Sequence, residues 1–250
     1  MRTFVCIDDT DNLSPEAKST GELARIMIEY IEEEGMGKCS FITRHQLYVH
    51  PDIPYTSHNS AMCFVIEHDK DIFKPLRDFA IDFLVRESSE GSDPGLCIVE
   101  EEKLKDRDLL IDYGKRAKKE ILTKENAYDT AKKLGVHLSE HGGTGGGVIG
   151  ALAGVGLRLT GNDGRIKGKI KFPLPKNILS VREILDNSTI DVVQSLDGDL
   201  ILENERVIIG EKVKTVFLDF KRVLLVYKKL DEQTNSYIWH TCIKEQWRNY

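Results

Sequence analysis

Short apolar runs and helical spacings of apolar residues alternate along the first two thirds of the chain. Residues 3–7 form a brief run rich in aromatic and β-branched side chains, which predicts a buried strand that stops at Asp8. Residues 19–22 read Ser-Thr-Gly-Glu, the pattern of a helix capping box, and apolar residues then recur at helical spacing up to Ile31. The chain therefore begins with a strand and a helix.

The same two patterns predict further elements. Brief apolar runs, typical of strands, occur at residues 39–43, 61–67 and 96–99. Helical patterns occur at residues 71–87, 105–121 and 124–134, and again from Val148. Strands and helices are thus interspersed, with a long polar loop before residue 61.

Beyond Pro173 and Pro175 the pattern becomes β-rich. Strands are expected at residues 190–193, 200–202, 207–209, 213–218 and 223–227. The two prolines mark a natural boundary, which predicts a first domain of residues 1–175 and a small second domain of residues 176–250. The fold class expected is α+β, a mixed sheet with flanking helices followed by a small β-rich unit.

The composition is that of an ordinary folded protein. Of 250 residues, 40% are hydrophobic and 30% charged, which excludes wholesale disorder and collagen-like chains. With 35 Lys and Arg against 41 Asp and Glu, the net charge of −6 gives no general attraction to nucleic acid. Local basic groups can still contact phosphates, and these are Arg165, Lys167, Lys169 and Lys171.

The cysteines and the apolar segments indicate a cytoplasmic protein. The five cysteines are odd in number and never spaced as Cys-x-x-Cys, so we expect buried reduced thiols and no structural zinc. The first residues lack the long apolar segment of a secretory signal. The longest glycine-rich apolar stretch is shorter than the about 20 residues that span a bilayer, so no membrane role is expected.

Three carboxylates follow the first predicted strand. Asp8, Asp9 and Asp11 lie within four residues, where each ionised group raises the pKa of its neighbours unless a cation intervenes. Mg²⁺ suits such oxygen ligands when phosphates complete its coordination, so the segment predicts a Mg²⁺ and nucleotide site. The alternative is a solvated Asp-rich turn.

A glycine-rich window is the second region with candidate chemistry. Eleven of the 20 glycines fall between Gly142 and Gly168. Backbone N–H groups that lead into the helix from Val148 are expected to contact phosphate, and these belong to Gly143, Thr144, Gly145, Gly146 and Gly147. The context fits neither a Rossmann fingerprint nor a Walker A loop. The alternative is close helix packing through small residues such as Gly150 and Gly154.

The loop before residue 61 offers hydrogen-bonding groups. Thr56, His58 and Asn59 are candidates to line a cleft, with His58 as a possible catalytic base or simply a surface residue. Residues 92–95 read Ser-Asp-Pro-Gly, which indicates a turn before a strand more strongly than a functional site.

Several segments together resemble a known family. CIDDTDN, STGELA, PDIPYTSHNSA, SDPGL and GGTGGGVIGALAGVG occur in the same order as in the N-terminal part of the archaeal 2-agmatinylcytidine synthetases that modify an isoleucine tRNA. The resemblance covers about residues 1–175. It implies an ATP- and Mg²⁺-dependent enzyme with a kinase-like domain beside a ferredoxin-like domain, and tRNA as a partner.

The resemblance also assigns residues. Asp8, Asp9 and Asp11 match the acids that bind metal and nucleotide phosphates, and Thr20 falls near a threonine that the family phosphorylates on itself. Gly21 replaces one of the paired threonines, which argues against autophosphorylation. The family's Lys-Thr-Arg-Gly-Asn motif is represented by residues 56–59, which keep a hydroxyl and an Asn but lose both cations.

The C-terminal part departs from the family. The 75 residues after Pro175 leave no room for both the OB-fold and the zinc ribbon that hold tRNA in the family. We therefore expect a shortened homologue that keeps the nucleotide site and acts on a small-molecule or RNA acceptor, with tRNA as one candidate.

Three functions remain open from the sequence. The favoured one is an ATP- and Mg²⁺-dependent phosphotransferase or ligase-like enzyme connected with tRNA processing. The second is a non-catalytic protein that binds a nucleotide or associates with RNA. The third is an aspartyl-phosphate phosphatase, because Asp9-Thr10-Asp11 after an apolar strand also resembles the start of the haloacid-dehalogenase phosphatases.

Overall fold

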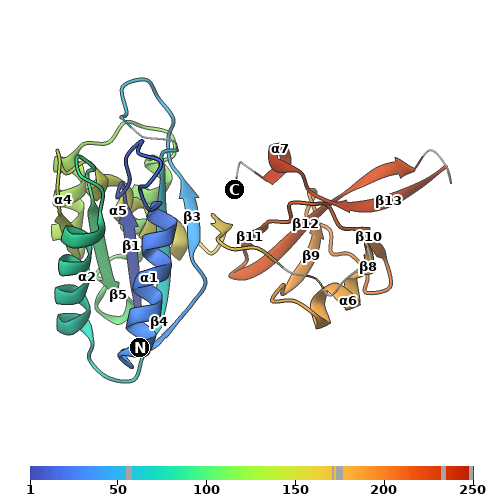
Figure 1. Cartoon of the computed structure of the whole chain (residues 1–250), viewed down its shortest axis with the longest axis horizontal. Coiled ribbons are helices and arrows are strands. Elements are labelled where there is room, and N and C mark those ends of the chain that lie inside the picture. The colour runs from blue at the N-terminus through green and yellow to red at the C-terminus, as the bar shows by residue number, and fades with distance from the viewer. Residues whose placement is uncertain (55–57, 171, 173–176, 232–234, 248–249) are drawn as a thin grey trace. The chain divides into compact units, whose positions relative to one another are not determined.

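The chain forms two compact units, Met1–Thr160 and Gly161–Tyr250. The structure is a computed structural model that describes residues 1–54, 58–170, 172, 177–231, 235–247 and 250 (Figure 1). The boundary predicted at residue 175 lies outside the described residues. Strand β7 (Arg165–Ile166) pairs with β11 (Thr215–Leu218), which is why the residues just after Thr160 belong to the second unit.

The first unit contains a sheet with the strand order β6-β5-β1-β4-β3, and β2 pairs with β4 beside β3. The strands are β1 (Arg2–Asp8), β2 (Lys38–Cys39), β3 (Thr43–Gln46), β4 (Ser60–Glu67), β5 (Gly95–Glu100) and β6 (His137–Glu140). All of these pairings are antiparallel. In the register of β1 with β5, Asp8 lies opposite Gly95, so the acidic end of β1 meets the start of β5.

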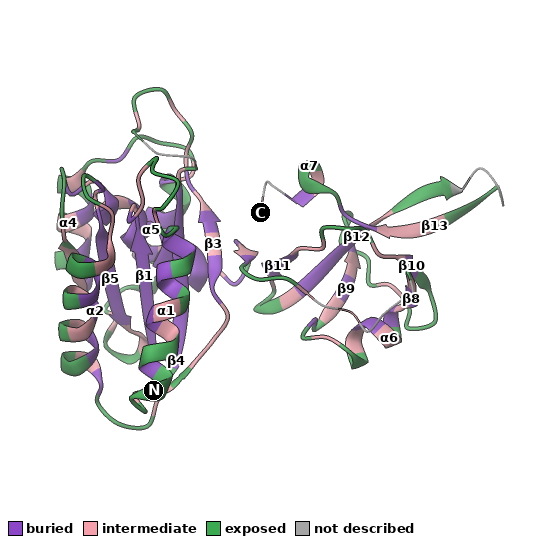
Figure 2. Cartoon of the chain, in the orientation of Figure 1, coloured by how far each residue is buried: buried purple, intermediate pink, exposed green. Residues whose placement is uncertain are grey.

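Helices cover both faces of this sheet (Figure 1). One face carries α1 (Thr20–Glu33) and α2 (Phe73–Glu87), and the other carries α3 (Arg107–Arg116), α4 (Lys124–Leu134) and α5 (Gly147–Leu159). Along β1, Val5 and Ile7 join the apolar cluster under α1 and α2, while Phe4 and Cys6 join the cluster under α5. Figure 2 shows the central strands buried throughout. Burial on both faces explains why β1 reads as a continuous apolar run.

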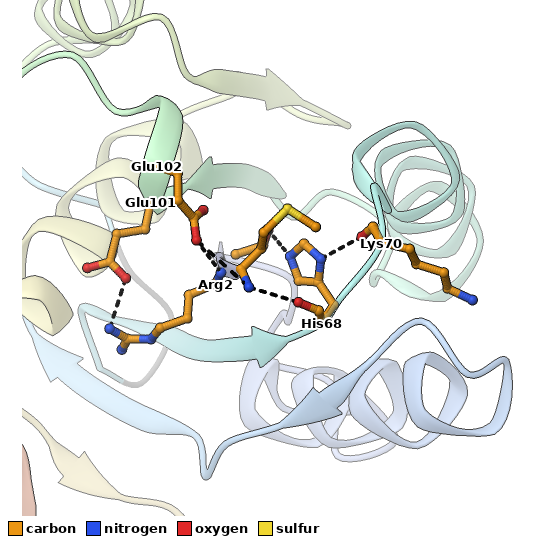
Figure 3. A network of polar contacts seen from close by, with 7 residues as sticks. Arg2, His68, Lys70, Glu101 and Glu102 are labelled. Atoms are coloured by element: carbon orange, nitrogen blue, oxygen red, sulfur yellow. Dashed lines mark hydrogen bonds and ion pairs between the residues drawn. The ribbon is translucent and has the colours of Figure 1, made fainter.

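Polar contacts fix the start of β1, at the end opposite to Asp8 (Figure 3). The N-terminal ammonium of Met1 donates to the carbonyl of His68 at 2.9 Å, and the backbone N–H of Arg2 donates to the Glu102 carboxylate at 3.0 Å. The Arg2 guanidinium donates to Glu101 at 2.8 Å. Each exposed ion pair contributes at most about 1 kcal/mol, but together they hold the terminal strand in the sheet.

The second unit is built mainly of strands in the order β7-β11-β12-β13-β10-β8, with β9 parallel to β12. Its elements besides β7 and β11 are β8 (Ile178–Ser180), α6 (Val181–Asp186), β9 (Val192–Ser195), β10 (Arg206–Ile208), β12 (Lys221–Asp231), β13 (Ser236–Thr241) and α7 (Lys244–Trp247). Along β12, Leu224 and Val226 join one apolar cluster, whereas Val223 and Leu225 join another on the opposite face. The period of two is that of a strand buried on both faces.

The α+β fold class is confirmed, and three element predictions need correction. Residues 200–202 form no strand: Leu200 makes only an isolated bridge with Gln194 and is 72% exposed. The strand expected at residues 39–43 is two separate strands, β2 and β3. The helix expected at residues 105–121 ends at Arg116, where the next carbonyl, that of Ala117, accepts a hydrogen bond from the Tyr48 N–H instead.

The cysteine prediction agrees with the structure. Cys6, Cys63, Cys97 and Cys242 are buried, Cys39 is partly buried, and all five are free thiols. Among the described residues, no helix is both long enough and apolar enough to cross a membrane.

Candidate functional site

The acidic end of β1 forms one wall of the candidate site. Asp8, the last residue of the strand, is buried, and Asp9 follows with a left-handed backbone at φ 52°. Such a conformation is uncommon for residues other than glycine, although Asp tolerates it better than most. The chain therefore turns sharply directly after β1, and strain of this kind is often found at functional sites.

The carboxyl groups of this wall are short of positive charge. Burial, aided by the charges of Asp9 and Asp11, raises the pKa of Asp8 from 3.8 to about 8. Burial, with the charges of Asp93 and Asp11, raises the pKa of Asp9 to about 6. A bound cation would favour the ionised forms and lower both pKa values.

The glycine loop before α5 forms the facing wall, and Asp93 holds it. The Asp93 carboxylate accepts hydrogen bonds from the backbone N–H and the hydroxyl of Thr144, the latter at 2.8 Å, and from the N–H of Gly145 at 3.2 Å. Gly145 has φ 75°, which a side chain would strain. The loop thus presents its donors to an anion, and in this structure the anion is the Asp93 carboxylate.

The two walls enclose a single cavity of about 100 Å³. Asp8 and Asp9 line it together with Gly146, Gly147 and Gly150, so the structure brings two of the predicted acids close to the end of the glycine loop. Gly143, Thr144 and Gly145 are not among its lining residues. Asp93 lines this cavity too. A wider hollow of about 530 Å³ shares Asp9 and Asp93 with it and adds Asp11. The carboxylates therefore lie where the cavity and the hollow meet.

Small residues of α5 allow the helix to approach β1 closely. A Cβ atom at Gly150 would lie 1.7 Å from Asp8 Oδ2, and one at Gly154 would lie 2.4 Å from the Cys6 sulfur. A Cβ atom at Gly147 would clash with the backbone of Asp93. Close packing, the alternative interpretation of these glycines, therefore operates alongside the lining of the cavity.

The remaining predicted site residues differ in whether they line the cavity. Asn59 lines the cavity, and its side-chain N–H donates to the carbonyl of Tyr48 at 2.7 Å. His58 is exposed and Thr20 is buried at the first turn of α1, and neither lines the cavity or the wider hollow. Thr56 lies outside the described residues.

The sequence interpretation missed two residues of the site. Asp93 was assigned to a turn, because Ser-Asp-Pro-Gly is a strong local turn signal. Lys124 starts α4, and its ammonium donates to the carbonyl of Thr144 at 2.7 Å and pairs with the Glu140 carboxylate. No local motif marks Lys124; only the fold brings its positive charge to the glycine loop.

The donor set suits a cation that is shared with a ligand. Among the described residues, no three His, Cys, Asp or Glu side chains are gathered as a complete metal site. Mg²⁺ commonly takes only one or two protein carboxylates and completes its octahedron with phosphates and water. The carboxylates at the cavity fit that mode of binding.

Solved structures share this arrangement of elements, although no family profile and no curated protein matches the chain. A complex of TiaS, an agmatidine synthetase for an isoleucine tRNA, with that tRNA and ATP matches 62% of this chain at 32% identity and a TM-score of 0.54. A TiaS complex with the same tRNA, AMPCPP and agmatine matches 73% at 28% identity and a TM-score of 0.52. The chain is TiaS-like.

A third structure, a tRNA fluorescent labeling enzyme, matches 71% of the chain at 29% identity and a TM-score of 0.54. The resemblance indicated by the sequence motifs is therefore confirmed. The chain spans 36–43% of the length of TiaS and the labeling enzyme in these three matches.

Proposed function

We propose that this chain is an ATP- and Mg²⁺-dependent phosphotransferase or ligase-like enzyme that acts in tRNA processing. One observation supports the proposal most directly: the buried Asp8 carboxylate at the end of β1, the adjacent Asp9, and Gly146 and Gly147 at the start of α5 line the same cavity. Phosphoryl transfer needs positioning and charge neutralisation around a polyphosphate; the glycine-lined wall would position the phosphates, and Mg²⁺ held by the carboxylates would neutralise their charge.

The carboxylates would hold the metal. Asp8, Asp9 and Asp11, joined by Asp93, are the groups available to Mg²⁺. When bound, the ion would neutralise phosphate charge and polarise the transferred group. Burial is the largest cause of the raised pKa values of Asp8 and Asp9, and repulsion among neighbouring carboxylates, which a bound cation would relieve, adds to it.

The glycine loop would hold phosphate oxygens. Gly146 and Gly147 line the cavity, whereas the N–H groups of Thr144 and Gly145 bind the Asp93 carboxylate and would reach a phosphate oxygen only if it displaced that carboxylate. Lys124 contacts the loop and would supply the positive charge that the loop at residues 56–59 lacks. The proposal gives no step to Thr20 or His58, since neither lines the cavity.

The acceptor is proposed from the solved structures that this chain resembles. The two TiaS complexes described above contain an isoleucine tRNA with ATP or an ATP analogue, and the second also contains agmatine. An RNA nucleotide is accordingly the acceptor that we propose for this chain, with an amine as the second substrate. Because the chain spans less than half of those structures, we extend to it the chemistry of the nucleotide site rather than the whole reaction.

Calorimetric titration of the full chain with a non-hydrolysable ATP analogue and Mg²⁺ tests the proposal. We expect saturable, Mg²⁺-dependent binding that Asp9→Ala weakens by about tenfold or more, which corresponds to the loss of one strong contact. The matched control is Asp52→Ala, whose carboxylate is 75% exposed and outside the cavity. Equal affinity in wild type and Asp9→Ala would contradict the proposal.

Turnover assays distinguish the proposed enzyme from the two alternatives, a non-catalytic binding protein and an aspartyl-phosphate phosphatase. Saturable ATP binding with no consumption of ATP in the presence of tRNA and amines would indicate a nucleotide-binding protein instead of an enzyme. A fluoroberyllate adduct on Asp9 would indicate aspartyl-phosphate chemistry.

A further inference from the structure

The second unit contains a hollow whose lining is positively charged. It has a volume of about 320 Å³ and is lined by Lys167 and Lys169 just after β7, and by Arg222 at the start of β12. No Asp or Glu is among the lining residues that the structure describes. Asp191 lies next to Arg222 outside this lining, so the three cations outnumber the acid nearby and form a favourable environment for an anion.

The charge of the chain is divided between its two units. Residues 1–160 hold 20 Lys and Arg against 28 Asp and Glu, a net charge of −8, whereas residues 161–250 hold 15 against 13, a net charge of +2. The basic hollow therefore belongs to the unit with the net positive charge, whereas the first unit has a net negative charge that repels a polyanion. A local basic surface on an acidic protein can direct such a ligand to one place.

Neighbouring contacts give the hollow a defined shape. Lys214 donates to the carbonyl of Gly168 at 2.9 Å, which ties the lysine-bearing segment to the strand region beside it. The Arg222 guanidinium donates to the Thr189 hydroxyl, and its backbone N–H donates to Asp191 at 2.7 Å. The guanidinium is thus held in place, and an ordered Arg loses less freedom when it binds an anion.

Neutral hydrogen-bonding groups complete the lining. Ser188, Thr189 and Thr215 contribute hydroxyl groups between the cationic side chains. The Ser188 hydroxyl donates to the carbonyl of Ile184 at 2.6 Å and caps the end of α6, so it also has a structural role. Cations with interspersed hydroxyls are the groups that most often contact nucleic-acid phosphates.

We propose that this hollow binds phosphate groups in the backbone of an RNA, at a site separate from the nucleotide cavity of the first unit. The phosphate chemistry follows from the lining residues alone. The choice of RNA as the source of the phosphate rests on the proposed function, in which RNA carries the acceptor nucleotide.

Fluorescence anisotropy of a labelled tRNA transcript with the full chain tests the site. The test variant is Lys167→Ala/Lys169→Ala, because both side chains are exposed and their loss should leave the core intact. The control is Lys212→Ala/Lys229→Ala, which removes the same charge from exposed positions of the same unit outside the hollow. Arg222→Lys is a second variant that keeps the charge and removes the guanidinium fork.

If the hollow is a specific site, the hollow double variant should lose more RNA affinity than the control double variant. The hollow variant should raise the Kd about tenfold or more and lower the slope of log K against log salt by about one to two, as expected when two phosphate contacts are lost. The control should change the Kd less than about twofold. Arg222→Lys should also weaken binding, since an ammonium cannot form two parallel bonds to phosphate.

Three outcomes would overturn the proposal. Equal weakening by both double variants would show diffuse attraction to the unit. Full competition by millimolar inorganic phosphate would indicate a small anion as the ligand. Binding to vesicles containing phosphatidylserine that the Lys167→Ala/Lys169→Ala variant loses to the same extent as tRNA binding would indicate a lipid surface. Asp9→Ala is the independent reference: it should lose Mg²⁺-dependent ATP binding and keep RNA binding, so failure of the nucleotide site and failure of this hollow are distinguishable.

Discussion

Asp93 binds Thr144 through both the backbone N–H and the side-chain hydroxyl of that residue, across 51 positions of sequence. The contact joins the turn before β5 to the loop before α5. Since β5 pairs with β1, the same carboxylate also lies beside the acids at the end of β1 and raises the pKa of Asp9. Asp93 therefore links the two walls of the cavity.

Removing this carboxylate should loosen the glycine loop. Asp93→Ala leaves two donors of Thr144 without their acceptor and the Gly145 N–H with only the Gly142 carbonyl, so we expect the free energy of unfolding to fall by about 1–2 kcal/mol. Amide hydrogen exchange at residues 142–147 should accelerate. Urea unfolding and exchange mass spectrometry measure both effects, with Asp52→Ala as the exposed control. Unchanged exchange in the loop would show that Asp93 does not hold it.

A side chain at Gly150 should disturb Asp8. The Cβ atom of Gly150→Ala would lie 1.7 Å from Asp8 Oδ2, so either the carboxyl group or α5 must move. We expect a loss of roughly 1–3 kcal/mol of stability, as for other overpacked cores. Gly146→Ala is the matched control in the same glycine run, because its Cβ would lie 3.5 Å from the nearest atom, at an ordinary contact distance. Thermal unfolding that ranks the two variants equally would contradict this assignment.

Ionisation of Asp8 should destabilise the folded protein in the absence of a cation. Its pKa is 3.8 in an unfolded chain and about 8 in the fold, so the unfolded state releases the proton first. Stability contributed by the protonated group is therefore complete below about pH 4 and is lost as the pH rises to about 8. Relative to wild type, Asp8→Asn should gain more than about 1.4 kcal/mol between these pH values, since that is the equivalent of one pKa unit.

Urea unfolding of both proteins at pH 4 and pH 8 measures this gain. Millimolar Mg²⁺ should reduce it at pH 8, and chelation with EDTA should restore it, because a bound cation stabilises the ionised carboxylate of wild type. A difference between the two proteins that stays constant with pH would sink the prediction.

Lys124 should contribute to nucleotide affinity. Its ammonium contacts the Thr144 carbonyl, so Lys124→Gln removes the positive charge next to the proposed phosphate position. We expect binding of the ATP analogue to weaken about tenfold, as for loss of a charge-assisted contact. Lys132→Gln, an exposed position on the same helix, is the control and should bind as wild type does. Calorimetry that finds both variants equal to wild type would remove Lys124 from the site.

The elements around the site were predictable because their signals are local. A strand that stops at Asp8 follows from an apolar run with an abrupt end, and the start of α1 follows from Ser19, whose hydroxyl accepts the N–H of Glu22. The apolar character of residues 148–159 likewise predicted α5. The α+β class followed from the sum of these patterns.

The partners within the site could not be found in this way. Asp93 carries a turn signal, and its contact with Thr144 depends on how β5 and α5 pack. Lys124 is one lysine among many until α4 is placed beside the loop. Polar strands such as β6 were missed for a similar reason, since His137–Glu140 has no apolar run and forms a strand through its pairing with β5.

The ability of this protein to bind ligand depends on the register that pairs Asp8 with Gly95. If β1 slid along β5 by a single residue, every side chain of β1 would exchange faces, and the acids would leave the opening that they line. A variant with misaligned strands could thus retain its helices and much of its compactness while being inert. Circular dichroism would not distinguish such a molecule from the native protein, whereas a titration with ligand would show that it does not bind.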